Sequence, residues 1–204
     1  MTKKFNLFII LLAVVAFAAC QSSGSDTATT NSTNTENKTT PKKEKAKKPA
    51  FDVIKAASTI EARSGSKLMG KAIFREANGR VSIVASVTNV TPGQHAMHIH
   101  AVGDCSGADG KTAGGHWNPD GHDHGKWGDK EHFHRGDIGN IEVGKDGKGR
   151  ITLTTDLWCL GCADEKKNII GKSLIIHAKA DDFESQPSGA AGSRIGCGVI
   201  AMEE

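Results

Sequence analysis

Three of the nine histidines of the chain fall within residues 93–100, which read Gly-Gln-His-Ala-Met-His-Ile-His. Side chains of a strand alternate between two faces, so His98 and His100 would share one face while His95 points to the other. Two imidazoles one strand step apart form a chelating pair for a metal ion. A histidine-rich polar edge strand without a metal is the alternative that this stretch alone leaves open.

Five more histidines lie in a long, polar, glycine-rich segment, residues 101–135, and Asp137 follows it closely. The five are His116 and the alternating pairs His122/His124 and His132/His134. Such a segment has too few apolar residues to order itself, whereas three imidazoles and one carboxylate complete a tetrahedral zinc site. Spacing does not decide which member of each pair would bind, and a hydrated loop is the alternative.

The segments that must position these side chains have sequences typical of short strands, separated by turns that contain Gly, Asn or Asp. Residues 81–87 alternate apolar and polar side chains and follow an Asn-Gly hairpin turn. Further strand-like runs are residues 67–74, 93–100, 141–143, 149–155, 173–177 and 197–202. About eight short strands without a convincing helix predict an all-β antiparallel sandwich or barrel. Two long loops, 101–135 and 178–193, interrupt this pattern, and loops of such length tend to be functional.

The first 50 residues have a composition unlike the rest. Residues 1–19 combine two early lysines with an apolar run and small residues before Cys20, as in a secretory signal peptide. The cut before a cysteine resembles a bacterial lipobox, so we expect Cys20 to carry a lipid; an ordinary signal peptide cut nearby is the alternative. The apolar run is shorter than the ~20 residues of a membrane span. Residues 20–50 are polar and basic and predict a disordered tether before a domain at 51–204.

The charge of the chain is divided unevenly along it. The formal net charge is +3, the leader carries +2 and residues 20–50 carry +3, which leaves −2 for residues 51–204. Lysines of the tether could meet a nucleic acid or a membrane surface, although a solvated stalk is the simpler interpretation. A domain of this charge gives no support to nucleic-acid binding. Its four cysteines are an even number, as expected for disulfides in an exported chain.

Several motifs, in order and at fitting separations, resemble the copper/zinc superoxide dismutases. They are Gly93-x-His-Ala-Met-His-Ile-His100, Gly103-Asp-Cys105, Gly114-Gly-His116-Trp-Asn-Pro119, His124-Gly125, His134-Arg-Gly-Asp-Ile-Gly-Asn140, Ile176-His-Ala-Lys-Ala-Asp-Asp182 and Gly192-Ser-Arg-Ile-Gly-Cys-Gly-Val-Ile200. The resemblance spans residues 53–202 and implies an eight-stranded antiparallel Greek-key barrel with an immunoglobulin-like sandwich architecture. It implies an oxidoreductase that disproportionates superoxide to oxygen and hydrogen peroxide, with copper and zinc as cofactors.

The resemblance also implies a role for individual residues. The implied copper ligands are His98, His100, His116 and His177. The implied zinc ligands are His116, His124, His134 and Asp137, so His116 would bridge the two ions. Asp181 would join His98 to His124, and Arg194 would guide the substrate anion. Cys105 and Cys197 would form the family's disulfide, whereas His95, His122 and His132 have no implied metal.

The clearest departure from the family pattern is Cys159-Leu-Gly-Cys162. Such a pair can be redox-active, bind a soft metal or form a short disulfide. No thioredoxin-like strand and helix surround it, so we expect a second, local disulfide in an exported protein. The alternative to a disulfide is that this pair delivers copper to the metal site.

Two rival functions would use the same fold. One is a metal-buffering or copper-carrying lipoprotein, and the other is a scaffold that binds zinc alone. A carrier needs neither Arg194, Asp181 nor a bridging His116, and a zinc-only scaffold would lack a copper ligand; the sequence has all of these residues. We therefore expect an antioxidant enzyme, anchored through Cys20 in a bacterial cell envelope, either in the periplasm or at the outer membrane. The expected partners are superoxide and the membrane, with a copper donor and a second copy of the chain as further candidates.

Overall fold

The computed structural model of the chain describes residues 53–130 and 132–203. The predicted signal peptide, Cys20 and the whole predicted tether, residues 20–50, lie outside these residues. The strands are β1 (Ile54–Ala62), β2 (Met69–Ala77), β3 (Arg80–Thr88), β4 (Gly93–His100), β5 (Asp137–Val143), β6 (Gly149–Thr155), β7 (Ser173–His177), β8 (Arg194–Val199) and β9 (Ala201–Met202). A short 3-10 turn, η1 (Lys111–Ala113), interrupts the first long loop. Within the described ranges, no helix has the length and apolar character needed to cross a membrane.

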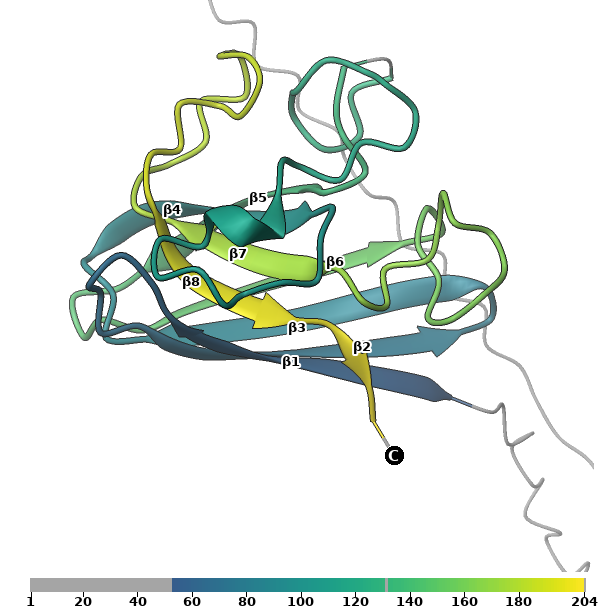
Figure 1. The fold of residues 1–204 in the computed structure, drawn as a ribbon, viewed down its shortest axis with the longest axis horizontal. Helices are drawn as coiled ribbons and strands as arrows, with labels where there is room; N and C mark the ends of the chain where they lie inside the picture. Colours follow the sequence, from purple (N-terminus) through teal and green to yellow (C-terminus); the bar gives the residue numbers. More distant parts are fainter. Residues whose placement is uncertain (1–52, 131, 204) are drawn as a thin grey trace, which may run out of the picture. The chain divides into compact units, whose positions relative to one another are not determined.

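The strands form one antiparallel sheet that closes on itself (Figure 1). Their order is β2-β3-β6-β5-β4-β7-β8-β1-β9, and β1 also pairs with β2. Strands β1–β8 therefore make the predicted eight-stranded barrel, whose closure removes exposed sheet edges. The neighbours β3–β6 and β4–β7 are distant in sequence, as Greek-key connections require. The fold prediction is confirmed.

The inside of the barrel is packed by alternate residues of each strand. In β3 the predicted apolar face is buried, and Phe74 of β2 is fully enclosed in the same core. Strands β4 and β7 differ, because every residue from His95 to His100 and all five residues of β7 are buried. Their outer face must therefore be covered. The two long loops rise on one side of the barrel (Figure 1), and the histidines of β4 and β7 are buried.

Each of the seven predicted runs overlaps a strand of the structure, whereas β1 was not among them. The boundaries that differ have local causes. Asn78 and Gly79 both have positive φ, 53° and 69°, as the two central residues of a tight hairpin turn require. Strand β5 begins at Asp137, four residues before the predicted run, because Ile138 is the one large apolar residue in its first half, Asp-Ile-Gly-Asn, which therefore shows no apolar alternation. The run predicted at 197–202 is divided between β8 and β9.

Two disulfides join the described cysteines. One links Cys105 of the first long loop to Cys197 of β8, across 92 residues of sequence. Closing a loop of that length in the unfolded chain stabilises the fold by about 4 kcal/mol. The other links Cys159 to Cys162 in the segment between β6 and β7. Both pairings are those expected from the sequence.

Replacing Ser58 by alanine should stabilise the domain. Ser58 of β1 is 1% exposed, and its hydroxyl oxygen has no hydrogen-bond partner in the described part of the chain. A buried hydroxyl without a partner costs about 1 kcal/mol or more, and alanine removes that cost. We expect a higher midpoint in denaturant with an unchanged slope. Ser82→Ala is the matched control, since the Ser82 hydroxyl donates to the Arg75 carbonyl; a lower midpoint for Ser58→Ala would contradict the expectation.

Candidate metal centre

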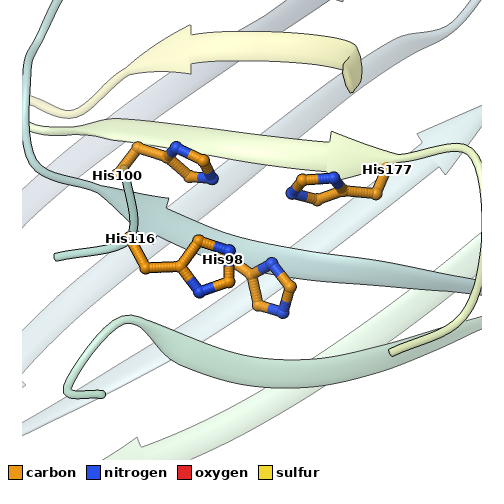
Figure 2. Close-up of side chains that lie close together, drawn as sticks. All are labelled: His98, His100, His116 and His177. Atoms are coloured by element: carbon orange, nitrogen blue, oxygen red, sulfur yellow. The ribbon is translucent and has the colours of Figure 1, made fainter. Parts of the chain in front are cut away.

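Four histidines from three parts of the chain meet at one point. His98 and His100 come from β4, His177 ends β7, and His116 comes from the first long loop, where it forms an isolated bridge with His100. One ring nitrogen of each lies within 4.8 Å of the corresponding nitrogens of the others. Figure 2 shows the four rings turned toward one another. The structure thus brings together the four residues expected to bind copper.

The nitrogens that face this point have no hydrogen-bond partner among the residues that the structure describes. They are His98 Nδ1, His100 Nε2, His116 Nε2 and His177 Nε2, all buried. A buried polar atom without a partner is rare and calls for an explanation, such as an ion. Four imidazole nitrogens form a donor set that suits copper. The site therefore fits copper.

The second nitrogen of each of these rings is held by the protein, which fixes the orientation of the ring. The partners of His98 Nε2, His100 Nδ1, His116 Nδ1 and His177 Nδ1 are Asp181 Oδ2 (2.8 Å), the Gly114 carbonyl (2.9 Å), Asp137 Oδ1 (2.8 Å) and the Gly192 carbonyl (3.3 Å). Tautomer and direction are thereby set before any ion binds.

Burial keeps most of these imidazoles neutral. Loss of solvent lowers the pKa of His100 to about 2 and that of His177 to about 3, and neighbouring imidazoles add to the effect. Burial also lowers the pKa of His116 to about 4, although Asp137 partly opposes it. A neutral imidazole has a free lone pair, which a metal ligand must provide.

A second group shares His116 with the first. It consists of His116, His124, His134 and Asp137, with ligand atoms again within 4.8 Å of one another. Asp137 Oδ1 lies 2.8 Å from His116 Nδ1 and 3.2 Å from His134 Nδ1, and Asp137 Oδ2 lies 2.9 Å from His124 Nδ1. His124 Nδ1 nevertheless makes no aligned hydrogen bond. Three imidazoles and one carboxylate are the donors of a closed zinc site, and the group fits zinc.

The structure separates the members of the two alternating pairs. His124 and His134 are buried within the second group, whereas His122 and His132 are exposed. His95 is also buried, but its ring bonds the carbonyls of His177 and Thr91, at 2.9 Å each. It has the structural role expected from its position on the opposite face of β4.

Asp181 connects the two groups by contacting one histidine of each. Its two carboxylate oxygens lie 2.8 Å from His98 Nε2 and 2.9 Å from His124 Nε2. Burial alone would raise the pKa of Asp181, but hydrogen bonds from the two imidazoles outweigh burial and lower the pKa below its usual range. Asn140 holds the Asp181 backbone through two bonds, N–H to Oδ1 at 2.7 Å and Nδ2–H to the carbonyl at 2.9 Å. Gly189 packs so closely that a Cβ there would collide with the carboxylate.

The copper side of the centre opens into a cavity of about 390 Å³. His100, His116 and His177 line it together with Ser188 and Arg194. The Arg194 guanidinium is fixed at the cavity, because Nη1 and Nη2 donate to the Gly110 and Gly114 carbonyls, each at 2.7 Å. Partial burial lowers the Arg194 pKa from its usual value, yet a guanidinium remains charged at neutral pH. A small anion entering the cavity meets this fixed cation.

Gln186 and Arg135, which were not predicted as site residues from the sequence, support the zinc side of the centre. Gln186 pairs with the backbone of His124, accepting from its N–H at 2.8 Å and donating to its carbonyl at 2.9 Å. Arg135 lies between His134 and Asp137 in sequence and is tied to other loops. No local pattern reveals either residue, because their partners are tens of residues away along the chain.

Zinc binding to the metal-free protein should release about one proton at pH 7, and His124 is the source of that proton. Burial opposes protonation of His124, but Asp137 and Asp181 outweigh it and raise its pKa to about 9. His124 is therefore protonated below pH 9, and zinc must displace that proton. The apparent zinc affinity should rise about tenfold for each pH unit between 7 and 9. Calorimetry in buffers of different ionisation enthalpy measures the protons released; zinc binding without proton release at pH 7 would contradict the expectation.

Comparisons with known proteins agree with this geometry. Residues 68–200 match the model of a family described as copper/zinc superoxide dismutase. Among solved structures, the crystal structure of the clock protein EA4 is similar, with 32% sequence identity and a TM-score of 0.65. That match covers 73% of this chain and 94% of the other.

Proposed function

The chain belongs to the copper/zinc superoxide dismutase family, and from that premise we propose how its own residues carry the reaction. It is an oxidoreductase that disproportionates superoxide, with copper and zinc as cofactors. Copper is held by His98, His100, His116 and His177, and zinc by His116, His124, His134 and Asp137. The observation that carries this proposal is the convergence of four buried, unpartnered imidazole nitrogens beside a fixed arginine.

The metal cofactors and the protein have separate roles in the reaction. When bound, copper supplies the one-electron redox couple that oxidises one superoxide ion to oxygen and reduces another to peroxide, while zinc is redox-silent. The overall reaction also consumes two protons. The protein binds the anion, orients it and supplies a proton beside it.

Arg194 binds and orients the anion. The domain as a whole is negative, so attraction must come from positive charge focused at the cavity. The two carbonyl contacts hold the guanidinium in place, which removes the cost of ordering it during the reaction.

His116 Nε2 would hold the transferable proton whenever it is not bound to copper. This nitrogen lies on the cavity side and has no hydrogen-bond partner among the described residues, whereas Nδ1 contacts Asp137. A proton at Nε2 is therefore next to the bound anion and can pass to the reduced product. The fixed ring orientation makes His116 a donor of defined direction.

Superoxide turnover of the metal-loaded protein tests the proposal. We expect His98→Ala to lose turnover together with copper, and Arg194→Ala to keep copper but lose about tenfold or more in kcat/KM. The matched control is His132→Ala, which removes an exposed histidine of the first long loop. A wild-type protein that binds both metals but turns over no faster than His98→Ala would instead support a copper carrier.

The protein is anchored in a bacterial cell envelope through a lipid on Cys20, after cleavage of residues 1–19, and residues 20–50 tether the domain 51–204 to the periplasmic or outer membrane. The basic and apolar leader, the small residues before Cys20 and the polar composition that follows support this proposal. There the enzyme provides antioxidant defence and receives copper from a donor protein; a homodimer also fits the family.

Labelling with a radioactive fatty acid in a bacterial host tests the anchor. The wild-type chain should carry label and sediment with membranes, and Cys20→Ser should do neither. The control is Ser22→Ala, a substitution in the same segment that leaves the cysteine intact. Label on the Cys20→Ser chain, or none on the wild type, would rule out this anchor.

A further inference from the structure

Arg135 lies in the turn that carries two of the proposed zinc ligands. Within this turn the Asp137 N–H donates to the His134 carbonyl at 2.9 Å, and the His134 N–H donates to Asp137 Oδ2 at 2.8 Å. Gly136 packs against the Ile99 carbonyl so tightly that no side chain fits there. The turn is thus short and closed, and a displacement of Arg135 displaces both ligands.

The side chain of Arg135 leaves the metal centre and binds other loops. Its Nη1 donates to the Lys166 carbonyl at 2.8 Å and to the Leu157 carbonyl at 3.4 Å, and its Nε donates to Asp120 Oδ2 at 2.6 Å. Only 18% of the side chain is exposed. A guanidinium presents several donors in a rigid plane, so it can bridge three acceptors that a lysine could not reach together.

The backbone of Arg135 is held by the same neighbour. Its carbonyl accepts a hydrogen bond from Trp158 Nε1 at 2.8 Å. Trp158 also packs edge-on against Trp127 of the first long loop, with ring centroids 5.4 Å apart. Side chain and main chain of Arg135 therefore both depend on the segment between β6 and β7, residues 156–172, which we call the disulfide loop.

The disulfide loop is itself closed and fixed to the barrel. The Cys159–Cys162 bond shortens it, and the Cys159 N–H donates to the Lys167 carbonyl at 2.8 Å. The Leu160 N–H donates to Glu76 Oε2 of β2 at 2.7 Å. These contacts set the positions of the Leu157 and Lys166 carbonyls that receive the Arg135 guanidinium.

We propose that Arg135 is a positioning residue through which the disulfide loop holds the zinc ligands His134 and Asp137 in place. This inference rests on the proposed zinc site. It gives the Cys159–Cys162 pair a function at ligands that lie 22 or more residues away along the chain, without redox catalysis or copper delivery by the cysteines. The predicted consequence is slow release of zinc, rather than a change in the copper ligands.

The rate of zinc release from the metal-loaded full chain to a chromogenic chelator tests the proposal. Arg135→Ala should release zinc about 10- to 100-fold faster, the usual range for a residue that supports metal ligands. Arg135→Lys should recover only part of the loss. The double variant Cys159→Ala/Cys162→Ala should also release zinc faster, and adding Arg135→Ala to it should change little further, because both act through the same contact. Arg150→Ala, at an exposed arginine of β6, is the matched control.

A spectroscopic measurement separates this effect from general loosening. Cobalt(II) bound in place of zinc should show altered visible bands in Arg135→Ala, while the copper(II) spectrum stays that of the wild type. Unchanged zinc release in Arg135→Ala, or strictly additive effects of the arginine and cysteine changes, would overturn the proposal. A wild-type chain that retains no zinc would contradict the proposed zinc site itself. Failure of the zinc site is therefore distinguishable from failure of the role proposed for Arg135.

Discussion

His116→Ala should lose both metals and with them more than about 100-fold of the superoxide turnover. Among the described residues, His116 is the one side chain that belongs to both ligand groups. Its Nδ1 lies 2.8 Å from Asp137 Oδ1, and its Nε2 is one of the unpartnered nitrogens of the copper group. Alanine leaves three ligands on each side and removes their connection, and loss of a ligand exceeds the 10- to 100-fold cost of losing an outer contact.

Metal content per chain, measured by elemental analysis beside turnover, checks this result. His122→Ala is the matched control, because His122 is exposed in the same loop and belongs to neither ligand group. A His116→Ala protein that keeps full copper and loses only zinc would show that the side chain does not bridge.

Asp181→Asn should weaken zinc binding by about 10- to 100-fold and lower turnover with it. Each carboxylate oxygen of Asp181 faces a ring nitrogen, of His98 on one side and of His124 on the other. An asparagine of the same shape presents an N–H to one of these rings, so one ring must turn or leave a donor facing a donor. The effect therefore reaches both groups through a residue that belongs to neither.

Chelator competition measures the zinc affinity of this variant. Asp182→Asn is the matched control, since Asp182 is the exposed neighbour in sequence. Gly189→Ala should reproduce the defect, because the added methyl group occupies the space of the Asp181 carboxylate. Normal zinc affinity in Asp181→Asn would show that the ligand rings are oriented by other contacts.

The part of the centre that lies on strands was predictable from the sequence. Period-2 alternation places His98 and His100 on one face of β4, and the structure has this strand at the predicted residues. His177 ends β7 at the predicted position. In a strand the side-chain direction follows from residue number alone, so local sequence is sufficient.

The site residues in the loops could not be predicted from local sequence alone. His122 and His124 are equivalent by spacing, and only the family resemblance distinguished them. In the structure His124 is selected by Asp181, 57 residues away along the chain. Gln186 and Arg135 were missed for the same reason, because a loop has no periodicity from which the direction of a side chain could be inferred.

The pairing of β9 with β1 has a consequence for protein engineering. Ala201 and Met202 pair with Ala57 and Ala56, so the two ends of the barrel lie side by side. A short linker can join them, and the Asn78-Gly79 turn offers an exposed place for new ends. A circular permutant that begins at Arg80 would then keep every proposed metal ligand, both cysteine pairs and Arg194 within one unbroken segment. The metal centre is thus encoded as a contiguous cassette, and the hairpin of β1 and β2 completes the barrel around it.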